Sequence, residues 1–375
     1  MARSKWIDII IKILLVIISP ILFLGICELT IRIFAPQIHG WIGENPHTTD
    51  PVLERIFRPN ISSAYIAADG RLVTINTNSM GFRGGREYGV KGSSIFRIAG
   101  LGDSFTNGSG VNDDETYLMV WEKQFNSAVS DNERRVEAIN MGVDTYGTIK
   151  ERIFLERFGV TIKPDLITVG FLPNDLWDNL GWVERHRQLN VTNSAERKDD
   201  IAPISPLIGI IYQLKEKSHF VIWLGKKLMS IPNVYKFAYH NHPEKFDFTN
   251  PDNQEVIGKA YALVHSELGR ISDFADSIGA KVAVISIPIR YQMVTGVDDQ
   301  KGDIRYLDKL LESSCRQWGI EFIPLLDTLR IANQEHELYF PMDGHLNVRG
   351  HQVVGQYLTH WLQSKDWFCK PKNMN

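Results

Sequence analysis

The chain has 375 residues, enough for one large domain or two of ordinary size at about 100–200 residues per domain. Hydrophobic residues make up 43% and charged residues 23%, which excludes disordered, collagen-like and low-complexity classes. A net charge of −3 argues against a nucleic-acid partner bound by bulk electrostatics. Three cysteines with no C-x-x-C pair provide neither a disulfide framework nor a zinc site.

The first 35 residues have the composition of a membrane anchor. From Ile9 to Cys27 the only charge is Lys12. The uncharged part of this run is shorter than the roughly 20 residues that cross the hydrocarbon core. The segment from Trp6 to Cys27 is long enough if Lys12 extends its amine to the interface. Basic residues before the run favour a cytoplasmic N-terminus.

Three other interpretations of this segment fit less well. A cleaved signal peptide needs a small-residue site, which residues 24–28 (LGICE) lack. A lipoprotein needs a small residue before its cysteine, where this chain has Ile26. A buried core helix would have a polar face. We therefore expect an uncleaved single-pass anchor at 1–35, in the inner membrane, with the chain from about Pro36 outside the cytoplasm.

The rest of the chain divides into a small region and a larger one. Residues 36–94 are rich in turn-forming residues and contain one predicted strand, Leu72–Asn76. Residues 95–370 alternate between apolar strands and helical patterns, which predicts an α/β domain with a parallel sheet covered on both faces. The predicted strands are 95–100, 136–140, 165–171, 281–287 and 321–324, and the predicted helices are 114–129, 148–158, 253–278 and 348–363.

Residues 177–253 interrupt this alternation and are predicted to form an insertion, which at such a position is usually a cap or lid. The insertion is rich in aromatic residues, which could stack on sugar rings, pack a lid or face a membrane. These residues are Trp182, Tyr212, Phe220, Trp223, Tyr235, Phe237 and Tyr239. His240 and His242 are predicted to lie in a solvated loop rather than to bind a metal.

Polar residues follow the predicted strands at the positions where a parallel sheet binds ligands, the carboxyl ends of its strands. Ser104 could be a nucleophile, but a hydroxyl is weak until a base takes its proton. His345 could be that base, and Asp343 could fix the tautomer of its imidazole. The simpler alternatives are a serine that caps a turn and an ordinary surface histidine.

Three groups after these strands could stabilise the oxyanion of an ester reaction. They are the backbone N–H groups of Ser104 and Gly142 and the side-chain amide of Asn174, each typically contributing about 2.7–4 kcal/mol. Asn174 could instead cap a helix. Asp103 and Asp175 are expected to brace these turns by hydrogen bonds.

These blocks together resemble the SGNH hydrolases of the GDSL esterase/lipase superfamily. The segments that carry the resemblance are GDSFT at 102–106, Gly142, G-x-x-x-N-D at 170–175 and D-x-H at 343–345. The resemblance implies a three-layer α/β/α sandwich of the flavodoxin-like type, serine-dependent ester chemistry, and no metal or organic cofactor. The N-terminal segments G-x-x-E-L-x-x-R (25–32) and NSMGFR (78–83) resemble membrane-anchored bacterial members of the superfamily.

Two spacings depart from the usual pattern of this superfamily. The third block is usually G-x-N-D, and the last is commonly D-x-x-H. The shorter D-x-H resembles branches that acetylate polysaccharides, and it leaves open whether Asp343 contacts His345. We therefore expect an ester hydrolase acting on acyl, in particular acetyl, esters of envelope carbohydrate. A polysaccharide O-acyltransferase, a lipid or thioester hydrolase and a non-catalytic binding module stay open, as does the oligomeric state.

Overall fold

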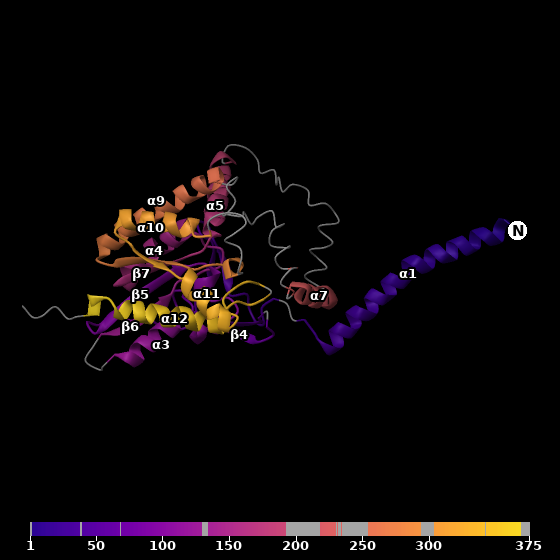
Figure 1. Ribbon diagram of the computed structural model, residues 1–375, viewed down its shortest axis with the longest axis horizontal. Coiled ribbons are helices and arrows are strands. Elements are labelled where there is room, and N and C mark those ends of the chain that lie inside the picture. The colour runs from indigo at the N-terminus through magenta and orange to yellow at the C-terminus, as the bar shows by residue number, and fades with distance from the viewer. Residues whose placement is uncertain are drawn as a thin grey trace, which may run out of the picture. The chain divides into compact units, whose positions relative to one another are not determined.

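The computed structural model describes most of the chain, in two compact units (Figure 1). One unit consists of Met1–Gly40 and Arg197–Ala238, and the other of Trp41–Glu196 and Tyr239–Asn375. Within these units the described residues are 2–37, 40–67, 69–129, 134–192, 218–229, 231, 234, 254–293, 304–341 and 343–368.

A five-stranded parallel sheet forms the centre of the larger unit. Its strands are β5 (Ile95–Gly102), β6 (Arg135–Asn140), β7 (Leu166–Phe171), β8 (Lys281–Ser286) and β9 (Glu321–Pro324). Every residue of β7 is buried, because helices cover both faces of the sheet. All five strands lie at the positions predicted from the sequence.

Helices cover the two faces of the sheet in separate layers (Figure 1). One layer contains α4 (Thr148–Ile162), α9 (Gln254–Ile278) and α10 (Tyr306–Trp318). The other contains α3 (Tyr117–Ala128), α11 (Leu326–Glu335) and α12 (Val348–Gln363). Each layer packs on its own hydrophobic core, which confirms the three-layer α/β/α sandwich; α10 and α11 were not predicted.

The strand order places two of the predicted site segments side by side. The order along the sheet is β6-β5-β7-β8-β9, so the chain moves first to one side of β5 and then to the other. In a doubly wound sheet, ligands bind at the carboxyl ends of the strands where this reversal occurs. The short helix α2 (Ser104–Asn107) follows β5 there, and α5 (Asp175–Thr192) follows β7.

Two antiparallel hairpins precede the sandwich. One pairs β1 (His47–Asp50) with β2 (Glu54–Phe57), and the other pairs β3 (Ser62–Ile66) with β4 (Leu72–Asn76). The strand predicted at 72–76 is confirmed. The other three were missed because they are short and carry few apolar residues at alternate positions.

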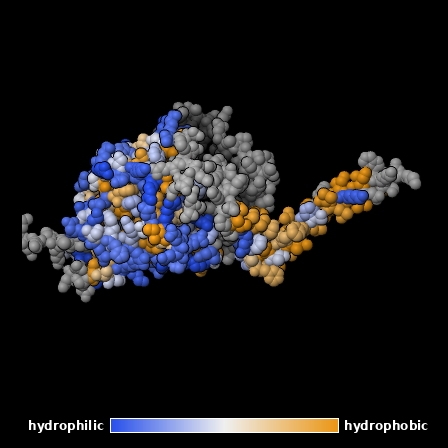
Figure 2. Space-filling model, in the orientation of Figure 1, coloured by the Kyte–Doolittle hydropathy of each residue, from blue (hydrophilic) through white to orange (hydrophobic). Residues whose placement is uncertain are grey.

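The smaller unit contains α1 (Ala2–Phe34), with Pro20 inside it, and α7 (His219–Met229). Its segment Ile9–Phe34 is long and apolar enough to cross a membrane, and hydrophobic residues cover the surface of α1 in Figure 2. Of the aromatic residues in the predicted insertion, Trp182 lies in α5, and Phe220 and Trp223 lie in α7. Tyr212, Tyr235, Phe237, Tyr239, His240 and His242 lie outside the described residues.

Candidate active site

Ser104 begins α2 directly after β5, and the local sequence determines this sharp change of direction. Gly102 has φ of +152°, a conformation that side chains rarely adopt, and a Cβ there would collide with Thr106. Asp103 caps α2 by accepting the N–H of Phe105 at 2.8 Å. The hydroxyl of Ser104 is therefore held at the first position of a helix, where the helix dipole favours developing negative charge.

His345 lies within hydrogen-bonding distance of Ser104, although 241 positions separate them in sequence. Its Nε2 is 2.8 Å from Ser104 Oγ. The loop that carries His345 is fixed by the Phe340 N–H, which donates to the His345 carbonyl at 2.8 Å, and by Gly344, whose φ is +77°. The ring of Phe105 lies 4.9 Å from the imidazole and packs against it.

Asp343 lies close to the other nitrogen of this imidazole but beyond hydrogen-bonding distance. Its Oδ1 is 3.6 Å from His345 Nδ1, and the same oxygen accepts the His345 backbone N–H at 3.0 Å. Burial alone would lower the pKa of His345, but the Asp343 carboxylate, aided by Asp103 and Asp144, outweighs burial and raises it above its ordinary value. The carboxylate therefore stabilises an imidazolium at this position.

The three predicted oxyanion donors differ in what they contact. The N–H of Ser104 has no acceptor among the described residues. The N–H of Gly142 donates to Asn140 Oδ1 at 3.0 Å. The side-chain amide of Asn174 donates to two carboxylates, Asp103 at 2.9 Å and Asp178 at 3.1 Å. The Ser104 N–H is thus free. The Gly142 N–H and the Asn174 amide must leave a present acceptor, or donate to two acceptors at once, to reach a substrate oxygen.

Asp178 was not identified from the sequence, although it lies one helical turn after Asn174 on α5. Burial raises the pKa of Asp178 to about 6, against the opposing effect of its hydrogen bond from Asn174. Burial likewise raises the pKa of Asp103 to about 6. The spacing of four between an amide and a carboxylate on one helix was the available signal for Asp178.

Two more carboxylates are buried behind Asn174, and one of them is the predicted brace Asp175. Neither Asp175 nor Glu151 has a hydrogen-bond partner for its carboxylate oxygens among the described residues. Burial raises the pKa of both groups well above the ordinary value. Repulsion from Glu151 adds to the effect on Asp175, and repulsion from Asp103 and Asp178 adds to the effect on Glu151. The contact to Asn174 expected of Asp175 is instead made by Asp178 and Asp103.

Arg83, at the end of the NSMGFR segment, supports the turn that follows α2. The side chain of Arg83 is buried. Its guanidinium donates to Asp113 Oδ1 at 2.8 Å and to the carbonyls of Asn107 (2.6 Å), Gly108 (2.8 Å) and Val111 (2.5 Å). The buried charge is therefore paired and hydrogen-bonded, as burial of a charge requires.

The N-terminal hairpins also bring polar groups toward the site, which the sequence did not indicate. His47 Nε2 lies 3.5 Å from Asp144 Oδ2, and burial lowers the pKa of His47 to about 4. Asp144 also accepts from Asn107 Nδ2 at 2.8 Å. The hydroxyl of Tyr65 accepts the Gly110 N–H at 2.6 Å. These contacts link the hairpins to the two turns next to Ser104.

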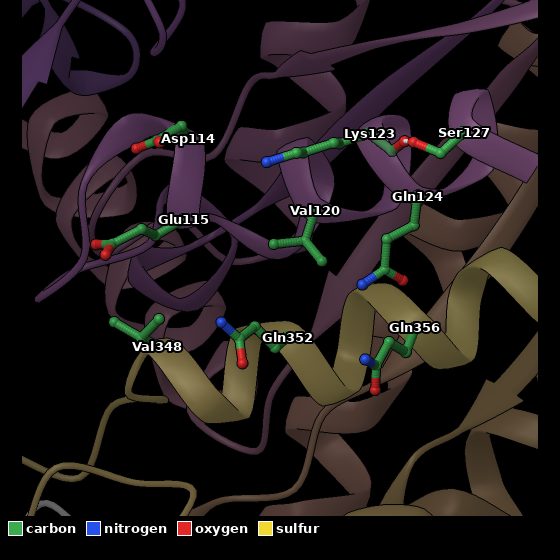
Figure 3. Close-up of a pocket in the computed structure, with 9 residues that line it drawn as sticks. All are labelled: Asp114, Glu115, Val120, Lys123, Gln124, Ser127, Val348, Gln352 and Gln356. Atoms are coloured by element: carbon green, nitrogen blue, oxygen red, sulfur yellow. Dashed lines mark hydrogen bonds between the residues drawn. The ribbon is translucent and has the colours of Figure 1, made fainter.

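Figure 3 shows a surface pocket between α3 and α12 that contains none of these residues. Its lining residues are Asp114, Glu115, Val120, Lys123, Gln124, Ser127, Val348, Gln352 and Gln356. These side chains, which are polar except for the two valines, include no nucleophile hydrogen-bonded to a base. Within the described ranges, no three His, Cys, Asp or Glu side chains are arranged to hold a metal ion.

Comparisons with known proteins identify the family and several similar folds. A family model described as GDSL-like Lipase/Acylhydrolase matches residues 101–353. A member of the lipolytic protein G-D-S-L family from Veillonella parvula is 15% identical, with a TM-score of 0.40, over 72% of this chain and 100% of that chain. An acetyl xylan esterase is 13% identical, with a TM-score of 0.40, over 72% and 100%. No curated protein matches the chain.

Proposed function

The chain belongs to the GDSL-like lipase/acylhydrolase family, and from this we propose that it is a serine-dependent hydrolase of acetyl esters on cell-envelope carbohydrate. The observation that carries the proposal is the 2.8 Å contact between Ser104 Oγ and His345 Nε2. That contact provides a nucleophile and its base at the sheet edge where ligands bind.

The proposed reaction has two halves that use the same groups. Ser104 Oγ attacks the ester carbonyl while His345 Nε2 takes its proton, and Asp343 stabilises the imidazolium. The tetrahedral oxyanion accepts from the Ser104 N–H and from the Asn174 amide, which must release one of its carboxylate partners. The intermediate collapses as the bond between the acyl carbon and the sugar oxygen breaks, and His345 gives its proton to that oxygen to form the free sugar hydroxyl. Water, activated by His345, then attacks the acyl-serine and releases the acid.

Two observations support a small acyl group on a carbohydrate. The D-x-H spacing resembles branches that acetylate polysaccharides. Tyr65 of the second hairpin and Asp144, in the turn after β6, both interact electrostatically with site residues. Polar and aromatic groups beside the site suit a sugar better than a long acyl chain.

We also propose that α1 anchors the protein in the inner membrane with the catalytic domain outside the cytoplasm. The apolar side chains along Ile9–Phe34 are exposed to their surroundings, and water is an unfavourable surrounding for such a run. Arg3 and Lys5 precede it, which favours a cytoplasmic N-terminus.

The test compares the full chain with Ser104→Ala, both purified in detergent. Release of p-nitrophenol from acetate, butyrate and octanoate esters would be followed, with and without acetylated and unacetylated oligosaccharides, and sugar products would be identified by mass spectrometry. We expect serine-dependent turnover that is fastest with acetate. Transfer of the acetyl group to added sugar would instead show an O-acyltransferase, and preference for octanoate would show a lipid esterase. Equal rates for both chains would refute serine-dependent ester chemistry.

A further inference from the structure

Glu28, near the end of α1, binds the first residues of α7. Its carboxylate accepts three hydrogen bonds, from Ser218 Oγ (2.8 Å), His219 N (3.1 Å) and Phe220 N (2.8 Å). Arg32 adds an ion pair at 3.0 Å, one turn further along α1. A helix begins with unpaired N–H groups and a partial positive charge, so a carboxylate there is a strong cap. The cap comes from a residue 190 positions away, which ties α7 to α1 at this point.

A second contact fixes the same junction from the chain that leaves α1. The N–H of Gln37 donates to His219 Nδ1 at 2.7 Å. Glu28 is the first acidic residue after the apolar run Ile9–Cys27. The start of α7 is therefore held beside Glu28 and Arg32, which are the first charged residues of α1 after Lys12 and which in a spanning helix lie toward the membrane interface.

Apolar side chains in α7 and just after it are exposed among the described residues, and we call them the apolar stripe. Ile222 is buried, whereas Leu224, Leu228 and Ile231 are 37%, 44% and 47% exposed. The spacing of four places Leu224 and Leu228 on one face of α7, and Ile231 follows the end of the helix. Lys227 is exposed beside the stripe, and Trp223 lies partly buried, with its ring stacked on that of Phe220.

We propose that α7 is an interfacial helix that lies on the bilayer crossed by α1, with Leu224, Leu228 and Ile231 in the acyl-chain boundary. The inference rests on the proposed anchoring of α1. An apolar stripe bordered by lysine is the pattern of a helix that lies in the headgroup region, and basic residues add attraction to anionic phospholipids. Because the hydrogen bonds at Glu28 already hold the start of α7 beside α1, the apolar stripe is close to the bilayer before it binds there.

The test uses the full chain reconstituted in vesicles of phosphatidylethanolamine and phosphatidylglycerol. The fluorescence of Trp223 is obtained as the difference between the wild type and Trp223→Phe. We expect phospholipids with a nitroxide near the headgroup to lower this difference about twofold, and those with a nitroxide at the chain end to lower it much less. Leu224→Asp with Leu228→Asp should abolish the quenching, and Glu28→Ala should reduce it. Arg32→Ala, which leaves the three cap bonds in place, is the matched control and should retain it.

Membrane retention after an alkaline wash separates the two proposals. If the protein stays in the vesicles and Trp223 is not quenched at either depth, α7 packs on protein instead and the inference is wrong. If the wash removes the protein, the anchoring of α1 fails, and the interfacial helix fails with it. Serine-dependent hydrolysis is measured on the same samples and is independent of both results.

Discussion

Replacement of Asp343 by Asn tests how the candidate triad differs from one with a buried acid. The carboxylate lies 3.6 Å from His345 Nδ1 and its side chain is 38% exposed. Two unit charges at this distance attract by about 1 kcal/mol in water and by about 5 kcal/mol at an effective dielectric constant of 20. Exposure places Asp343 toward the lower value, so we expect a loss of about 1–3 kcal/mol of transition-state stabilisation.

That loss corresponds to a roughly 5- to 150-fold fall in kcat/KM, well below the approximately 10⁴-fold fall seen when a buried triad aspartate is replaced. The pH profile should change as well. Asp343 raises the pKa of His345, and the base acts only when neutral, so activity rises as pH passes through this pKa. In Asp343→Asn the acidic limb should therefore move to lower pH while the plateau falls.

The assay is p-nitrophenyl acetate hydrolysis across pH for the wild type, Asp343→Asn, His345→Ala and the double variant. If Asp343 acts through His345, the second substitution costs nothing further in the His345→Ala background. A 10⁴-fold loss would show that the carboxylate closes to a full hydrogen bond in the working state. An unmoved acidic limb, or equal losses in both backgrounds, would refute an action of Asp343 through the imidazole.

Three further substitutions test the surroundings of the site. Asp178→Asn removes a negative charge beside the Asn174 amide, which is to face the oxyanion, but keeps a hydrogen-bond acceptor. Because the pKa of Asp178 is about 6, kcat should rise about three- to tenfold at pH 8 and stay unchanged at pH 5. A uniform fall in kcat at both pH values would show that the charge is needed. In Arg83→Ala, loss of the buried guanidinium should lower the free energy of unfolding by about 3–5 kcal/mol, measured in urea, whereas a change below about 1 kcal/mol would contradict its structural role. In the wild type the raised pKa of Glu151 means that the folded state binds the proton more tightly than the unfolded state does. The wild type therefore loses stability as pH rises above about 4.5, and in Glu151→Gln the melting temperature should depend less on pH. The exposed Glu156→Gln on the same helix is its control, and an equal pH dependence of the wild type and Glu151→Gln would be the contrary result.

The central sheet could be predicted because its strands are apolar runs with a length and flanking turns that leave little choice. The strand Glu321–Pro324 and the helix Val348–Gln363 even have the predicted bounds. The hairpin strands at 47–66 escaped prediction because pairing between short polar segments is determined by long-range contacts, such as the Tyr65 hydroxyl with the Gly110 N–H.

The candidate site, like the fold, could be predicted only in part from the sequence. Ser104 directly follows β5, so the rule that ligands bind at the carboxyl ends of parallel strands could indicate it. His345 lies between α11 and α12 rather than at the end of a strand, and the resemblance of its D-x-H segment indicated it. The bond from Asn174 to Asp178 had a signal in their spacing of four, but the bond from Asn174 to Asp103 had none, because it depends on how the turn before α5 is oriented relative to Asp103. The buried pair Glu151 and Asp175 was equally invisible, since nothing in a sequence marks a carboxylate that lies in the core without a partner.

The hydrogen bonds of Arg83 bear on how this enzyme could be inherited or recombined. The family match begins at residue 101, but the guanidinium that supports the turn at 107–111 comes from residue 83. A gene fragment that began at β5 would encode every predicted catalytic group, but it would lack the guanidinium that donates to Asp113 and to the buried carbonyls of Gly108 and Val111. The hairpin region and the sandwich should therefore be exchanged between genomes as one piece, and a chimera joined between them should need a donor that restores those bonds.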